Sequence, residues 1–161
     1  MNNKLYIGMV NGAFGIKGEV KIFTQSNLKE KIFSVGKKLI IDDKEYEIEK
    51  FREHKDNILV TFKDYDDINK IDELIHKEVF IERKELDLND NEYLYIELLD
   101  LDIIENNISI GKVEELLLNK KTIFIKNGSL IIPICDKYIE NVDIKEKKVY
   151  VKDIGELRIW R

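Results

Sequence analysis

Four of the chain's eight glycines lie within eleven residues near its start, at Gly8, Gly12, Gly15 and Gly18. Glycine adopts positive φ and lets two backbones approach closely, so such a cluster is typical of tight turns and of loops that bind phosphate. A phosphate loop needs Lys followed by Ser or Thr after its last glycine, but Gly18 is followed by Glu19, and no dinucleotide fingerprint Gly-x-Gly-x-x-Gly occurs. The cluster therefore predicts a shaped loop between two strands, or a glycine loop that touches a partner.

The segment 15–18 also matches the Gly-x-x-Gly loop with which KH domains grip an RNA backbone. KH domains flank that loop with helices, whereas strand patterns flank it here, so a loop between barrel strands is the favoured interpretation. The candidate loop residues are Gly8, Gly12, Phe14, Gly15, Lys17 and Gly18.

A second group of candidates follows a polar stretch in the middle of the chain, where Tyr93 and Tyr95 stand two residues apart. Large aromatic side chains at a domain junction are typical anchors of protein interfaces. Alternation in an extended segment would place both rings on one face, where they either contact a partner or pack between two domains. The sequence leaves both alternatives open.

Catalytic constellations are missing from the sequence. His54 and His76 are isolated and lack the spacing of a zinc site, and Cys135, the single cysteine, is expected to be a buried, inert thiol. Adjacent carboxylates such as Asp66 and Asp67 point apart on a helix or strand instead of converging on a substrate. We therefore expect no catalysis, no metal and no cofactor. An RNA-processing or RNA-modifying enzyme with an unrecognised site is the alternative.

The 161 residues carry a net charge of −5, and this charge is unevenly distributed. Residues 1–41 have a net charge of +5, residues 42–84 one of −5 and residues 85–161 one of −5. The division predicts one surface for a polyanion and another for a basic protein, unless the charges are merely solvated strand faces. The chain has no secretory signal pattern, no long apolar run and one cysteine, so we expect a cytoplasmic protein.

Short runs with strand patterns dominate the first half, and Val20 and Ile22 show the period-2 alternation of a half-buried strand. These runs cover residues 4–10, 18–24, 37–41, 44–51, 57–62 and 78–82. Residues 64–75 carry apolar side chains at helical spacing and predict one helix, and residues 28–33 predict a shorter helical stretch.

The polar residues 85–91 predict a linker, which would separate an N-terminal domain (1–84) from a C-terminal domain (92–161). Asn127 and Gly128 separate two apolar runs and predict a type I′ hairpin turn, and 106–107 and 145–146 predict further turns. Many short strands at this spacing predict an all-β fold of barrels or sandwiches. The second-half strands are expected at 101–105, 110–118, 121–126, 129–134, 138–144 and 147–152.

Residues 7–22 (IGMVNGAFGIKGEVKI) resemble the opening signature of the ribosome maturation factor RimM family. The match includes every glycine of the core pattern and its Glu-Val, here Glu19 and Val20. Phe14 stands where the family usually has His, so no role of that histidine is transferred to it.

A second signature of the family, an acidic residue followed by two tyrosines and Asp-Leu-Ile-Gly, resembles residues 92–100. Tyr93 matches the first tyrosine, Leu94 replaces the second, and Asp100 replaces the glycine. Tyr95 would substitute for part of the lost aromatic surface. The run from 130 to 151 is similar to the family's closing PRC-barrel strands, so the resemblance spans nearly the whole chain.

The resemblance implies two small β-barrels in tandem, a six-stranded barrel like those of translation factors and a C-terminal PRC barrel. It implies a monomeric, non-catalytic assembly factor that binds the precursor of the small ribosomal subunit near its head and contacts the nineteenth small-subunit ribosomal protein. Direct contact with 16S rRNA stays open, and a PRC-barrel adaptor of another complex is a weaker alternative. The residues expected to contact the partner are Tyr93, Leu94, Tyr95 and Glu97.

Overall fold

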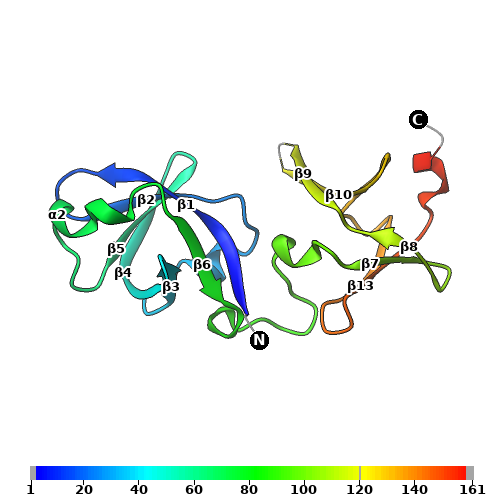
Figure 1. Cartoon of the computed structure of the whole chain (residues 1–161), viewed down its shortest axis with the longest axis horizontal. Helices are drawn as coiled ribbons and strands as arrows, with labels where there is room; N and C mark the ends of the chain where they lie inside the picture. Colours follow the sequence, from blue (N-terminus) through cyan, green and yellow to red (C-terminus); the bar gives the residue numbers. More distant parts are fainter. Residues whose placement is uncertain (1–2, 120, 159–161) are drawn as a thin grey trace. The chain divides into compact units, whose positions relative to one another are not determined.

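The chain divides after Asn89 into two domains, residues 1–89 and 90–161 (Figure 1). The computed structural model describes residues 3–119 and 121–158. The division falls inside the predicted linker, but the first part of that segment is structured, because a 3₁₀ turn, η2 (Arg83–Leu86), buries Leu86 completely. The connection without regular structure is therefore shorter than the polar composition predicted.

The six strands of the N-terminal domain close into a barrel, as expected, in the order β1-β2-β5-β4-β3-β6. All neighbouring strands are antiparallel. The strands are β1 (Lys4–Phe14), β2 (Glu19–Phe23), β3 (Lys38–Ile41), β4 (Lys44–His54), β5 (Asn57–Phe62) and β6 (Glu78–Glu82).

Strand β1 is long because it pairs with β2 on one side and β6 on the other, and its register shifts once against each. Gly8 lies at the shift against β6, and a Cβ atom there would be 2.2 Å from the carbonyl oxygen of Phe23. Only glycine permits this approach of two backbones. Val20 and Ile22 are fully buried, as their alternation predicted.

Two short helices lie in this domain where helical stretches were predicted, and both are shorter than expected. They are α1 (Lys29–Ile32) and α2 (Ile68–Ile71), the latter continued by the 3₁₀ turn η1 (Asp72–Leu74). The predicted helix 64–75 begins late because Tyr65 still forms a β-bridge with Phe62. Asp67 then caps α2, accepting a hydrogen bond from the Asn69 amide at 2.7 Å.

The C-terminal domain contains a three-stranded sheet, β11-β10-β9, and a four-stranded sheet, β12-β13-β7-β8, in a barrel-like arrangement around one core. Strands β13 and β7 are parallel, and the other pairs are antiparallel. The strands are β7 (Asp102–Glu105), β8 (Ile108–Lys112), β9 (Glu115–Asn119), β10 (Thr122–Asn127), β11 (Leu130–Pro133), β12 (Ile139–Asp143) and β13 (Lys148–Val151), followed by a 3₁₀ turn, η4 (Ile154–Arg158).

The predicted strand 110–118 is wrong, because it divides into β8 and β9 at Val113. Val113 is fully buried and exchanges backbone hydrogen bonds with the loop before β7: its amide donates to Leu101 and its carbonyl accepts from Asp100, both at 2.9 Å. This inward residue redirects the chain from one sheet to the other. A continuous apolar run carries no sign of that change of direction.

The hairpin between β10 and β11 forms where Asn127 and Gly128 predicted it, but the turn type differs. Asn127 pairs with Leu130, so the two turn residues are Gly128 and Ser129, and only Gly128 has positive φ, at +57°. A type I′ turn needs positive φ at both positions, so that prediction is wrong, and the conformation matches the requirement of type II′.

A turn with positive φ at both central residues joins β3 to β4, at Asp42 (+53°) and Asp43 (+65°). Replacing Asp43 by Gly should raise the free energy of unfolding by about 0.5–1 kcal/mol, since relief of the left-handed backbone outweighs the extra entropy of unfolded glycine. The exposed Lys4–Asp43 ion pair, at 3.1 Å, contributes less. Urea unfolding of Asp43→Gly beside Asp43→Asn, which loses only the charge, measures this; a glycine variant less stable than the asparagine variant would refute it.

Candidate functional site

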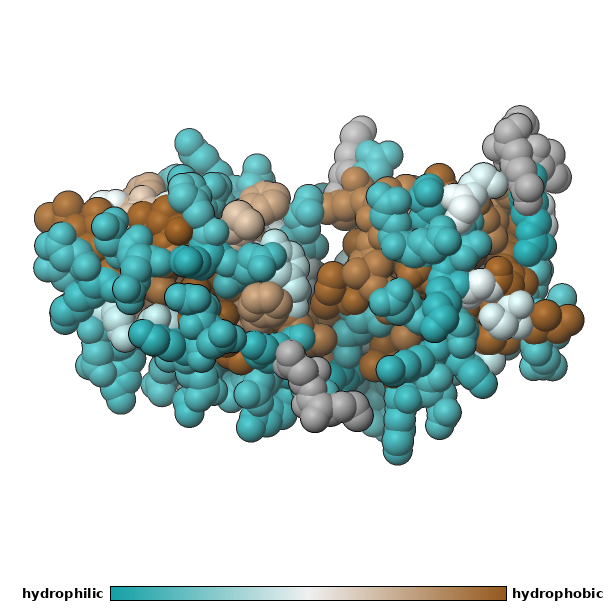
Figure 2. Space-filling model, viewed as in Figure 1, coloured by the Kyte–Doolittle hydropathy of each residue, from teal (hydrophilic) through white to brown (hydrophobic). Residues whose placement is uncertain are grey.

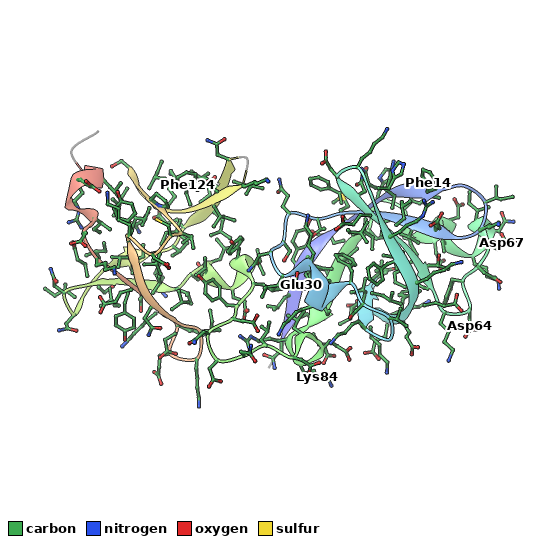
Figure 3. All side chains as sticks on the ribbon, turned by 180° about the vertical axis from the view of Figure 1, so that it is seen from behind. Phe14, Glu30, Asp64, Asp67, Lys84 and Phe124 are labelled. Carbon is green, nitrogen blue, oxygen red and sulfur yellow. The ribbon has the colours of Figure 1, made fainter. Side chains whose placement is uncertain are left out.

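The glycine loop between β1 and β2 is held against the segment that leads into α2. Gly18 has φ +83°, and a Cβ atom there would lie 2.4 Å from the Tyr65 carbonyl oxygen. The Ile68 amide donates to the Ile16 carbonyl at 3.2 Å. Figure 3 shows Phe14 on β1 and Asp67 at the start of α2 at the same end of this barrel. The last glycine is therefore required by close packing within the protein.

The tip of the loop is exposed. Ile16 has 76% of its surface accessible, and Gly15 and Lys17 are also exposed. Gly15 has positive φ, +71°, with open space around it. The loop thus offers an aliphatic and a cationic side chain to solvent, while its base is fixed.

Phe14 lies in a cluster that the sequence did not indicate. Its ring is 4.8 Å from the ring of His54, and the Arg52 guanidinium lies 5.3 Å from the ring centre. Arg52 donates two hydrogen bonds to the Glu19 carboxylate, at 2.9 and 3.0 Å. These bonds, and then the nearby positive charges of Arg52 and Lys50, lower the pKa of Glu19, although burial opposes the shift.

One sequence signal could have found this cluster. Lys50, Arg52 and His54 alternate along β4 and therefore share a face of the sheet. The residues between them are Phe51 and Glu53, so the three cationic or imidazole side chains gather on one face of the strand. The sequence could not show that Phe14 and Glu19, more than thirty residues earlier, meet that face.

The tyrosine segment forms a 3₁₀ turn, η3 (Tyr95–Leu98), and not the extended segment expected from alternation. Glu97 stabilises the start of the turn, accepting a hydrogen bond from the Leu94 amide at 2.9 Å. The rings of Tyr93 and Tyr95 nevertheless lie side by side, with centres 6.5 Å apart. The two rings are therefore brought together by the 3₁₀ turn and not by alternation along an extended segment.

Burial changes the role of these residues. Leu94 is fully buried, so its side chain is not available to a partner and the prediction of a direct contact is corrected. Tyr93 and Tyr95 are half-buried and pack against the core of the C-terminal domain. Burial, and then the proximity of Tyr95, raises the pKa of Tyr93. Internal packing is thus observed, and contact of the remaining ring surface with a partner stays a prediction.

Three of the seven lysines in the basic opening segment, residues 1–41, contact Asp43 or Asp87. Lys4 pairs with Asp43 and Lys37 with Asp87, each at 3.1 Å, and Lys31 donates to the Asp87 carbonyl at 2.9 Å. Residues 1–89 carry 16 basic and 18 acidic side chains, a net charge of −2, and residues 90–161 carry −3. Folding mixes the two signs within the N-terminal domain, so the division of charge along the sequence overstated their separation in space.

Cys135 is exposed, so the expectation of a buried thiol is wrong. Across residues 3–119 and 121–158, no three His, Cys, Asp or Glu side chains gather in a way that could hold a metal ion. None of the helices in the described part of the chain is long and apolar enough to cross a membrane.

Comparison with known proteins agrees with the resemblance that the glycine motif indicated. The family model of the RimM N-terminal domain matches residues 5–86, about half of the chain. The chain belongs to the RimM family. The ribosome maturation factor RimM of Acholeplasma laidlawii is 32% identical over 94% of this chain and 97% of its own length. That of an Exiguobacterium species is 28% identical over 93% and 94%.

A solved structure described as a 16S ribosomal RNA processing protein RimM, from Pseudomonas aeruginosa, is 22% identical, with a TM-score of 0.46. The match covers 92% of this chain and 96% of that one. The membership of the RimM family rests on the family model and the full-length relatives.

Gly18 and Gly15 provide a matched pair that tests how the RimM glycine loop is held. Both have positive φ, but only Gly18 has backbone atoms within reach of an added Cβ. Gly18→Ala should lower the free energy of unfolding by about 3 kcal/mol, from strain plus steric overlap, and Gly15→Ala by about 1 kcal/mol, from strain alone. Chemical denaturation of both variants measures the difference. Equal losses would show that the contact with residues 65–67 does not constrain the loop.

Proposed function

We propose that this chain promotes late assembly of the small ribosomal subunit and processing of its 16S rRNA by binding the immature particle near its head, without catalysis. The observation that supports this most is membership of the RimM family along nearly the whole length, with relatives named ribosome maturation factor. The protein would act as a cytoplasmic monomer, hold its partners in register, and leave when mature contacts replace it.

Two adjacent pairs of carboxylates have structural partners, which agrees with a binding role. Asp67 caps α2, and Asp66 pairs with Lys70 at 3.4 Å. Glu115 pairs with Lys126 at 3.8 Å, and Glu114 accepts from the Gly128 amide at 2.7 Å. In each pair the two carboxylates therefore bind different groups and do not converge on one point.

The C-terminal domain has the properties of a protein-binding module. Its net charge of −3 favours a basic partner, and ribosomal proteins are basic as a class. Ile108, Leu118 and Ile131 are exposed large aliphatic residues. On the face drawn in Figure 2, hydrophobic residues gather over this domain. We therefore propose that this domain contacts the nineteenth small-subunit ribosomal protein, with Tyr93, Tyr95 and the turn held by Glu97 at the contact.

Co-sedimentation with purified ribosomal particles tests the function. The chain should pellet with precursor small subunits and much less with mature ones, since the mature contacts displace it. Equal binding to both particles, or binding to neither at low salt, would contradict the release mechanism. The same preparation should leave precursor RNA uncleaved in the presence of Mg²⁺, whereas cleavage would favour an RNA-processing enzyme.

Replacing Tyr93 and Tyr95 together by Ala should weaken binding to precursor subunits at least about five-fold, because interface aromatics carry much of the binding energy. Both rings also pack inside the domain, so the double variant will lose stability. Ile139→Ala is the matched control, since Ile139 packs half-buried against the same core. Thermal unfolding and co-sedimentation are measured for both. If Ile139→Ala weakens binding as much as the double variant, the tyrosines act through stability and leave the proposed contact.

A further inference from the structure

Strand pairing brings cationic and aromatic residues onto one face of the N-terminal barrel. Lys21 pairs with Leu59, which pairs with Arg52, so all three side chains leave the sheet on the same side. Two residues further along the strands, a second row runs through β1, β2, β5 and β4: Met9, Phe23, Asn57 and His54. We call these two rows, together with Phe14, Glu19 and Lys50, the β1–β2–β5–β4 face.

Large apolar groups on this face are open to solvent. Phe23 is 40% exposed, and Met9, its direct partner across the strands, is 38% exposed. The Phe23 ring and the Met9 side chain are therefore the apolar groups on this face that a ligand could reach.

The charge of this face is opposite in sign to that of the chain. Lys21, Lys50 and Arg52 are its cations, and Glu19 is its single acidic residue. Glu19 is held by both guanidinium hydrogen bonds of Arg52. Neither Lys21 nor Lys50 forms a salt bridge with any described residue, unlike Lys4 and Lys37 elsewhere in the barrel. Two lysines are thus free to bind an anion.

We propose that the β1–β2–β5–β4 face binds single-stranded RNA, with Lys21 and Lys50 on phosphates and a base stacked on Phe23. Unpaired lysines beside an exposed aromatic ring on a sheet form the combination with which proteins hold single strands. Paired strands lie about 4.8 Å apart, so Lys21 on β2 and Lys50 on β4, with β5 between them, stand at least roughly 10 Å apart and can contact different phosphates of one strand. This inference adds an RNA-binding surface to the proposed function. That ribosomal RNA is the natural ligand rests on the proposed function.

The positive charge of this face fits either RNA or an acidic protein. The exposed Phe23 ring, on which a base can stack, favours RNA. Arg52 already binds a carboxylate, Glu19, so the structure itself neutralises one cation. The negative charge of the Glu19 carboxylate would also repel an approaching phosphate. Removing its charge should therefore strengthen RNA binding, the opposite of what loss of a structural contact would do.

Fluorescence anisotropy of the full chain with labelled oligouridylate of about twelve nucleotides tests the face directly. Lys21→Gln/Lys50→Gln should weaken binding about ten-fold at low salt and reduce the slope of log K against log salt by about 1.4. Phe23→Ala should weaken it at least about five-fold. The matched control is Lys29→Gln/Lys38→Gln, which removes two exposed lysines elsewhere in the domain and should change affinity less than about two-fold.

Glu19→Gln should tighten binding two- to three-fold, roughly the effect of removing one repulsive charge near the site. Thermal unfolding of each variant separates binding from folding. Equal weakening by both lysine pairs, no effect of Phe23→Ala, or weaker binding by a folded Glu19→Gln variant would each overturn the assignment.

Co-sedimentation with precursor subunits, run beside the RNA titration, separates the two proposals. If the wild-type chain pellets with the subunit but binds no bare RNA, the RNA assignment is overturned, and loss of pelleting in the Lys21→Gln/Lys50→Gln variant would then indicate a protein on this face. If RNA binds with the expected pattern of variants and the subunit does not, the RNA face stands and the proposed function fails.

Discussion

The N-terminal barrel depends on one strand that serves two neighbours. Strand β1 pairs with β2 and β6, and without both pairings the sheet would have open edges. Gly8 allows this, because any side chain at that position would overlap the Phe23 carbonyl. The length of β1 has a further effect, since it carries Phe14 to the end of the barrel, where it meets Arg52 and His54 from β4.

Closure also explains why charge along the sequence and charge in space differ. Folding of the domain brings residues far apart in the chain together, so Lys4 meets Asp43 and Lys37 meets Asp87. Lys21 and Lys50, which form no salt bridge with a described residue, lie on the β1–β2–β5–β4 face, where Glu19 is the single acidic residue. The local net charge on the surface of a β-barrel therefore depends on which residues the strand pairing places side by side.

The two domains use aromatic residues differently. In the C-terminal domain, Tyr93 and Tyr95 pack half-buried against a core, supported by the turn that Glu97 caps. In the N-terminal barrel, Phe23 and Met9 form an exposed pair with no such support. The packed tyrosines suit a protein contact, because their side chains lose little conformational entropy on binding. The exposed Phe23 ring suits a ligand with a flat surface, such as a nucleic-acid base.

The sequence by itself determined the strand-rich fold, the closed six-stranded barrel through its family resemblance, the positions of most strands, and the loop glycines. These follow from local rules, because alternation reports burial and positive φ demands glycine. The tertiary structure decided what depends on distant partners. It buried Leu94, exposed Cys135, divided the run 110–118 at Val113, and gathered Phe14, Glu19, Arg52 and His54. No local pattern encodes these outcomes, because each is fixed by strand pairing between residues far apart in the chain.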